Sequence, residues 1–249
     1  MLTTGLTNLI LLRGNIQNPH WQAEVKKWLI YIDSKGELNR FISRLTKQDE
    51  RKANEALVEI SSAYVLEKRL KYKVTDWEKP TLSNKNVDFV IKNGSDEIYC
   101  EVKRPSWMGE LPKDQLNNDR SSRKWKAKYI NAESFSFGHW RNIRKAIKKA
   151  YPKFLKDKKN LVVIHDDLRV PILNDIVTKE MIDIALFLDK KVQGSYDSEL
   201  GYFADCKYNR VGGILFIDIN PGSVNEIYKS LFIENPNALI QFKIKTTVL

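Results

Sequence analysis

The sequence predicts an α/β protein with a mixed β-sheet that carries helices on both sides. Three observations lead to this prediction. Two short apolar runs flank Asn93-Gly94, which is the pattern of an antiparallel β-hairpin. A basic segment with helical spacing, 141–159, separates this hairpin from the apolar run 161–166, and a strand–helix–strand order favours a parallel crossover. A further apolar run, 212–219, predicts another buried strand.

The chain is expected to divide into an N-terminal helical extension, residues 1–47, and a main domain, residues 48–249. Residues 1–17 show no clear period and are left without an element. The pair Asn18-Pro19 suits an N-cap followed by the first helical position, so a helix is expected to begin there and to end at Gly36. A second helix is expected from an apolar stripe of Leu38, Phe41, Ile42 and Leu45.

A third helix is expected over residues 48–71, because acidic residues at its start and basic residues at its end complement the helix dipole. Glu59 borders the apolar stripe of this helix and can point past the packed face toward a neighbouring sheet. A strand over residues 72–77 and a loop over 80–86 then lead into the hairpin.

The second half of the chain is also expected to contain both helices and strands. Residues 106–132 are irregular and basic, with tryptophan and tyrosine between the cations. Pro152 is expected to kink or divide the helix within 141–159. After the strand 161–166 we expect four elements: a helix around Ile182 to Leu188, the strand 212–219, a short helix near 224–232 and a final strand over 239–248.

The chemistry centres on the hairpin. Alternate side chains of a strand share a face, so Glu101 and Lys103 point the same way. The place of Asp88 depends on the register. A turn of Asn93-Gly94 alone would put Asp88 diagonal to Glu101, whereas a turn over residues 93–96 would put it directly across.

In both registers the two carboxylates share a face and repel each other unless a cation lies between them. Carboxylate oxygens are hard ligands that suit Mg²⁺ or Mn²⁺. The hairpin therefore predicts a metal site with an adjacent ammonium. The alternative is an edge hairpin whose charges face water.

An aspartate, then a Glu-x-Lys triplet after a hairpin, with a glutamate-bearing helix before both, resembles the motif of the PD-(D/E)xK nuclease superfamily. The matching residues are Asp88, Glu101, Lys103 and, on the helix, Glu59. Val87 stands where the motif's name has proline, and that proline is commonly absent in the superfamily. The resemblance covers residues 50–105 and extends more weakly to residue 166.

The resemblance implies a restriction-endonuclease-like core and a metal-dependent endonuclease or exonuclease with Mg²⁺ or Mn²⁺ as cofactor. The cation would be held by Asp88, Glu101 and the carbonyl of Val102. Lys103 would orient a water molecule or stabilise the charge of the transition state. The helix carboxylate would be an auxiliary ligand or an anchor, and Glu55, one turn before Glu59, competes for that role. Mrr-like relatives often carry a glutamine in the helix that corresponds to 141–159, and Lys153 stands there instead.

The charge balance points to a polyanionic partner. The chain has 42 basic and 31 acidic residues, which leaves a net charge of +11. Such an excess favours nucleic acid, and DNA first. The expected contacts are the cations near the hairpin, in the basic loop and on the basic helix: Arg104, Arg120, Arg123, Lys124, Lys126, Arg141, Arg144 and Lys148.

Two other functions fit the same residues: a non-catalytic nucleic-acid-binding protein that keeps the nuclease hairpin, and a module that binds an acidic protein. A homodimer is left open, and no surface for one is identified. No segment is apolar enough to span a membrane, so no membrane partner is expected. The two cysteines, without CxxC spacing, favour a reducing, cytoplasmic location.

Overall fold

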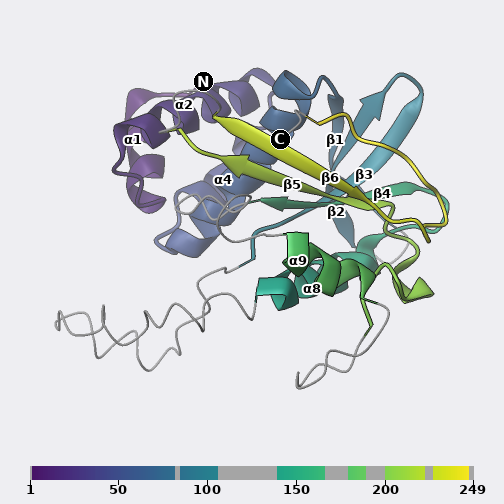
Figure 1. Ribbon diagram of the computed structural model, residues 1–249. Helices are drawn as coiled ribbons and strands as arrows, with labels where there is room; N and C mark the ends of the chain where they lie inside the picture. Colours follow the sequence, from purple (N-terminus) through teal and green to yellow (C-terminus); the bar gives the residue numbers. More distant parts are fainter. Residues whose placement is uncertain are drawn as a thin grey trace, which may run out of the picture.

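A computed structural model gives the fold of the chain and describes residues 2–81, 85–105, 139–165, 179–188, 200–221 and 227–246. Within these ranges six strands form one mixed, open sheet in the order β1-β2-β3-β4-β5-β6 (Figure 1). The pairs β1·β2, β2·β3 and β5·β6 are antiparallel, and β3·β4 and β4·β5 are parallel. The strands are β1 Lys73–Pro80, β2 Asn86–Asn93, β3 Asp96–Lys103, β4 Lys159–His165, β5 Gly213–Ile219 and β6 Tyr228–Glu234.

The N-terminal helices cover one face of this sheet (Figure 1). They are α1 Thr4–Arg13, α2 Pro19–Ser34, α3 Leu38–Leu45 and α4 Glu50–Tyr64, which continues into a π-helical turn, Val65–Arg69. Their buried side chains, such as Trp28 and Leu57, join one core with Phe89, Cys100 and Val163 of the strands. The helices before residue 47 thus share a core with α4 and the sheet, and the boundary at that residue stays a prediction.

The other face of the sheet carries the later helices (Figure 1). They are α8 His139–Ala150, a 3-10 turn Tyr151–Lys153, and α9 Lys179–Ile182 with a π-helical turn Asp183–Phe187. Ile143 and Ile147 of α8 are fully buried and belong to a second core with Val162 and Ile164 of β4. The prediction of a mixed sheet with helices on both sides is therefore confirmed.

Local sequence explains where the main helices begin and end. The Asn18 side chain accepts hydrogen bonds from the backbone N–H groups of His20, at 2.9 Å, and Trp21, at 3.4 Å, so α2 starts at Pro19 as predicted. Asp49 caps α4 in the same way. At the end of α8 the chain tightens into the 3-10 turn that contains Pro152, because proline lacks the N–H that a continuing helix needs.

Two predicted elements are wrong, and one helix was not predicted. Residues 4–13 form α1, where no element was assigned. The expected helix near 224–232 is strand β6 from Tyr228 onward, with residues 222–226 outside the described part. Residues 239–246 form no strand, although Phe242 and Ile244 are buried alternately as the pattern predicted. In the described part of the chain, none of the helices is long and apolar enough to cross a membrane.

Candidate active site

The turn of the hairpin decides the register of Asp88. Asn93 pairs with Asp96, and Phe89 pairs with Cys100, so the turn spans residues 93–96. In this register Asp88 lies across from Glu101, one position beyond the last paired residues. The second of the two predicted registers is the one that forms.

Strands β2 and β3 part at Asp88. Their pairing ends at Cys100, whereas β3 stays paired with β4 as far as Lys103. The Asp88 Oδ2 atom accepts a hydrogen bond from the Val102 backbone N–H at 2.7 Å, in place of a backbone carbonyl of β2. Because the N–H and C=O of one strand residue point to the same edge, the Val102 carbonyl also faces the gap between the strands.

Two ammonium groups lie against the carboxylates. The Lys103 Nζ atom forms an ion pair with the Glu101 Oε1 atom and donates to the Val102 carbonyl oxygen at 3.2 Å. The Lys153 Nζ atom, from the turn after α8, lies 2.6 Å from Glu101 Oε1 and 3.8 Å from Asp88 Oδ1. Residues from β2, β3 and the α8 turn therefore meet at one point.

Glu101 is fully buried, and its Oε2 atom has no hydrogen-bond partner. Burial raises the pKa of the Glu101 carboxyl, the charge of Asp88 raises it further, and the two ammonium groups oppose both effects. Burial alone would lower the pKa of Lys153, but the charges of Glu101 and Asp88 outweigh it and raise that pKa. Each charge at this site thus depends on its neighbours.

The helix carboxylate near the site is Glu59. Its side chain is 8% exposed and binds Arg44 of α3 at 2.7 Å, whereas Glu55 is exposed and pairs with Arg51. Burial and the charge of Asp88 raise the pKa of Glu59 to about 8, against the opposing effect of Arg44. The charge of Asp88 therefore affects the pKa of Glu59, although Glu59 accepts its hydrogen bond from Arg44.

The described residues contain no group of three or more His, Cys, Asp or Glu side chains placed to hold a metal ion. The site offers two carboxylates and one carbonyl. His165, at the end of β4, is of a residue type that binds metal ions. His165 is buried with its Nε2 atom 3.0 Å from the Ser61 hydroxyl of α4, on the opposite face of the sheet from Glu101, and Asp166 and Asp167 lie outside the described residues.

The expected nucleic-acid contacts fall into three groups. Arg141 and Lys148 are exposed on α8, where Lys145 and Lys149 join them, and Arg104 is half-buried directly after β3. The prediction for Arg144 is wrong, since its side chain is 2% exposed and donates to the carbonyls of Ile184 and Ala185. Four of the predicted contacts lie outside the described residues: Arg120, Arg123, Lys124 and Lys126.

Arg44 and the ion pairs of Lys153 are site features that sequence reasoning missed. The sequence marks Lys153 only as a departure from a glutamine, and nothing in the pattern of α3 marks Arg44. Both depend on how distant helices pack, and Arg44 contacts a residue 15 positions away.

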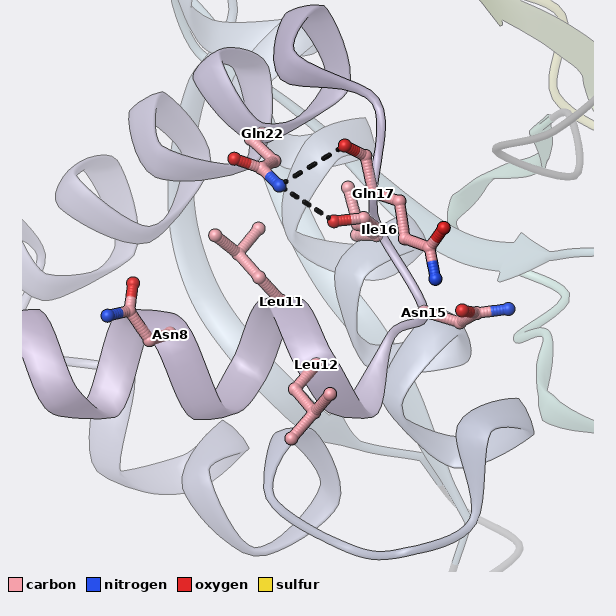
Figure 2. Close-up of a pocket in the computed structure, with 7 residues that line it drawn as sticks. All are labelled: Asn8, Leu11, Leu12, Asn15, Ile16, Gln17 and Gln22. Atoms are coloured by element: carbon pink, nitrogen blue, oxygen red, sulfur yellow. Dashed lines mark hydrogen bonds between the residues drawn. The ribbon is translucent and has the colours of Figure 1, made fainter.

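A surface hollow of about 360 Å³ lies at the α1–α2 connection and is lined by none of the site residues. Figure 2 shows the Gln22 amide bridging this connection through hydrogen bonds to the carbonyls of Ile16, at 3.1 Å, and Gln17, at 3.3 Å. The amide closes the turn that joins the two helices. This hollow is therefore separate from the candidate active site.

Comparisons of the chain with family models, with curated proteins and with solved structures give no match.

Proposed function

We propose that the protein is a metal-dependent nuclease with a restriction-endonuclease-like core, acting on the phosphodiester bonds of nucleic acid and first of all DNA. One observation carries the proposal: Asp88 and Glu101 lie across from each other and share the ammonium of Lys153, with a Lys103 ammonium beside them. Two facing carboxylates, of which Glu101 is fully buried and Asp88 is half-buried, need a cation, and their oxygens are the donors that Mg²⁺ and Mn²⁺ prefer.

The residues present fit a divalent cation. Glu101 keeps a buried oxygen without a partner, and Asp88 Oδ1 is its oxygen on the Lys153 side, since Oδ2 takes the Val102 N–H. The Val102 carbonyl faces the same gap. These three groups would hold the ion, and Glu59 with Arg44 would set the electrostatic environment of Asp88.

When bound, Mg²⁺ or Mn²⁺ supplies a Lewis acid for a phosphoryl oxygen and lowers the pKa of a bound water. Lys103 would orient that water or stabilise the charge that develops on the phosphoryl oxygens, because its ammonium is held between Glu101 and the Val102 carbonyl. Lys103 belongs to strand β3, so the position of its backbone does not depend on substrate binding.

The distribution of charge supports a nucleic-acid substrate. Residues 104–159, which join β3 to β4, contain 16 basic and 5 acidic residues. The rest of the chain has 26 of each, so the whole net charge of +11 lies in this one segment. It begins directly after Lys103 and includes Lys153, so the segment with the basic excess follows the carboxylates in sequence and also supplies one of their ion-pair partners, which supports a polyanionic substrate.

The test is divalent-cation binding together with cleavage. Asp88→Asn combined with Glu101→Gln should abolish Mn²⁺ binding in calorimetry and cleavage of supercoiled plasmid, linear duplex and single strands in Mg²⁺. Asp96→Asn combined with Glu97→Gln removes the same charge from the exposed turn end of the hairpin and should change neither. Mn²⁺ binding that survives the first double substitution would place the metal elsewhere.

Lys103→Ala completes this experiment. It should lower the cleavage rate by about 10²-fold or more while duplex affinity stays close to wild type, because one fixed cation acts on the transition state and contributes little to ground-state binding. Full activity in this variant would remove Lys103 from the mechanism.

The second candidate is a non-catalytic nucleic-acid-binding protein. The observation that favours it is that Lys103 and Lys153 already neutralise the two carboxylates. This function predicts tight, salt-sensitive duplex binding with neither Mn²⁺ binding nor cleavage, so the same experiment separates the two candidates.

A further inference from the structure

Among the residues that the structure describes, Lys153 is the basic residue whose ammonium contacts both carboxylates of the site. Its Nζ atom is 2.6 Å from Glu101 Oε1 and 3.8 Å from Asp88 Oδ1, whereas Lys103 contacts Glu101 and the Val102 carbonyl. Asp88 Oδ1, on the Lys153 side, is also one of the oxygens that would hold a divalent cation. This one oxygen cannot serve both the ammonium and the cation fully, although Glu101 has Oε2 free for the cation.

The two lysines differ in how they are anchored. Lys103 is part of β3, where it pairs with Ile164 of β4, so its backbone is fixed by the sheet. Lys153 ends a three-residue 3-10 turn after α8, and its side chain is 26% exposed. The flexible four-carbon stem of Lys153 can swing away from the carboxylates without disturbing a strand.

We propose that Lys153 is a positioning residue that holds Asp88 and Glu101 together when no metal is bound and is displaced from them when a divalent cation binds. This inference rests on the proposed function. This displacement of Lys153 by the cation couples metal binding to substrate binding. The displaced ammonium stays beside the site, on the segment that carries the basic excess of the chain. There it can meet a phosphate oxygen.

If the cation displaces Lys153, removing the Lys153 charge should strengthen Mn²⁺ binding. A purely structural role for Lys153 predicts the opposite change in Mn²⁺ affinity. Lys153→Gln removes the competing charge, so metal-free protein should bind Mn²⁺ about tenfold more tightly in calorimetry, since one charge a few ångströms away acts strongly on a divalent ion. At saturating Mn²⁺ the variant should nevertheless cleave DNA more slowly. Lys153→Arg keeps the charge and should bind Mn²⁺ close to the wild-type affinity.

Lys156→Gln is the matched control. Lys156 lies on the same segment, is exposed, and loses the same charge on substitution. It should leave Mn²⁺ affinity within about twofold of wild type, because exposed charges farther away are screened. An equal gain in both variants would mean a general effect of net charge and would overturn the displacement of Lys153 by the cation.

A metal-free measurement completes the test. Urea unfolding in EDTA of Lys153→Gln, Glu101→Gln and the combined variant should show that the two shifts of the midpoint do not add, because the residues contact each other. Mn²⁺ affinity that is unchanged or weaker in Lys153→Gln, with wild-type protein binding Mn²⁺, would overturn this inference alone. No Mn²⁺ binding by any variant would overturn the proposed function as well.

Discussion

The two carboxylate oxygens of the buried Glu101 side chain differ in their hydrogen-bond partners. Both ammonium groups of the site contact its Oε1 atom, whereas Oε2 is buried without a hydrogen bond. A buried carboxylate with half of its hydrogen-bonding capacity unused costs free energy, and replacing such a group with an apolar one is often neutral or stabilising. The arrangement therefore suits a ligand that completes Oε2, which is the role proposed for the cation.

Glu59 yields a prediction that needs no metal. In the unfolded chain its carboxyl ionises near pH 4.5, while in the folded protein the pKa is about 8. Between these values the folded state binds more protons, so the free energy of unfolding should fall as the pH rises, by at most about 1.4 kcal/mol per pH unit, and should level off above pH 8. Urea midpoints in EDTA from pH 5 to 9 should show this decline in wild-type protein and a flatter profile in Glu59→Gln.

The groups that set this pKa come from three elements: Asp88 from β2, Glu78 from β1 and Arg44 from α3. Glu55→Gln is the control, because Glu55 lies one turn earlier on α4 but is exposed and pairs with Arg51. It should retain the wild-type profile. Parallel profiles for wild type and Glu59→Gln would show that Glu59 ionises normally and that Arg44 dominates its environment.

At the scale of elements, helix α8 has one apolar face and one cationic face. Its inner face is fully buried at Ile143, Ile147 and Ala150, and its outer face is a row of exposed cations: Arg141, Lys145, Lys148 and Lys149. The helix leads directly into the turn that carries Lys153. A phosphate backbone along the outer face would therefore lead toward the carboxylates.

Changing the four outer cations of α8 to glutamine should weaken duplex binding and flatten its salt dependence. The slope of log K against log salt should fall by about 0.9 for each phosphate contact that is lost. The fold should persist, since exposed substitutions of this kind change stability by about 0.5 kcal/mol or less each. Fluorescence anisotropy over a range of salt concentrations gives the slope, and circular dichroism checks the fold.

The control for α8 is an equal loss of charge on the other side of the sheet. Lys26, Lys47, Lys52 and Lys68 are exposed on or beside the N-terminal helices. Their replacement by glutamine should leave the slope nearly unchanged. If both sets lower the slope equally, the nucleic acid meets the molecule through its net charge and has no preferred face.

Sequence patterns predict these elements where one period dominates. Helices α2, α3 and α8 have clear apolar stripes, and the hairpin has its turn signal. Residues 9–12 of α1 are four apolar residues in a row, which surround a helix instead of marking one face. Tyr228, Leu231 and Phe232 have helical spacing by chance, but β5 supplies a strand partner that no local pattern reveals.

The same limit applies to the site. Asp88, Glu101 and Lys103 lie close together in sequence, so the alternation of strands and one turn suffice to place them. Lys153 reaches them only because α8 packs on the sheet. Arg144 was misplaced because Trp140, Ile143, Arg144 and Ile147 repeat as i, i+3, i+4 and i+7, which puts the arginine on the buried stripe of α8.

For the whole molecule, the separation of charge is the feature with most consequence. All of the net positive charge lies in residues 104–159, and the remaining residues balance. Copies of the chain would bring these segments together only against electrostatic repulsion unless a polyanion lies between them. In the proposed function, the facing pair of Asp88 and Glu101 would serve one phosphodiester bond at a time.

These two properties predict a monomer that cuts one strand per encounter. Sedimentation at low salt without nucleic acid should give a particle of 29.0 kDa. With Mg²⁺ and supercoiled plasmid, nicked circles should accumulate before linear DNA, and their rate of appearance should rise in proportion to protein concentration. The Asp88→Asn, Glu101→Gln variant should give neither product. A particle of twice the mass, together with linear DNA that forms without a nicked intermediate, would instead mean that two chains bring their sites to opposite strands.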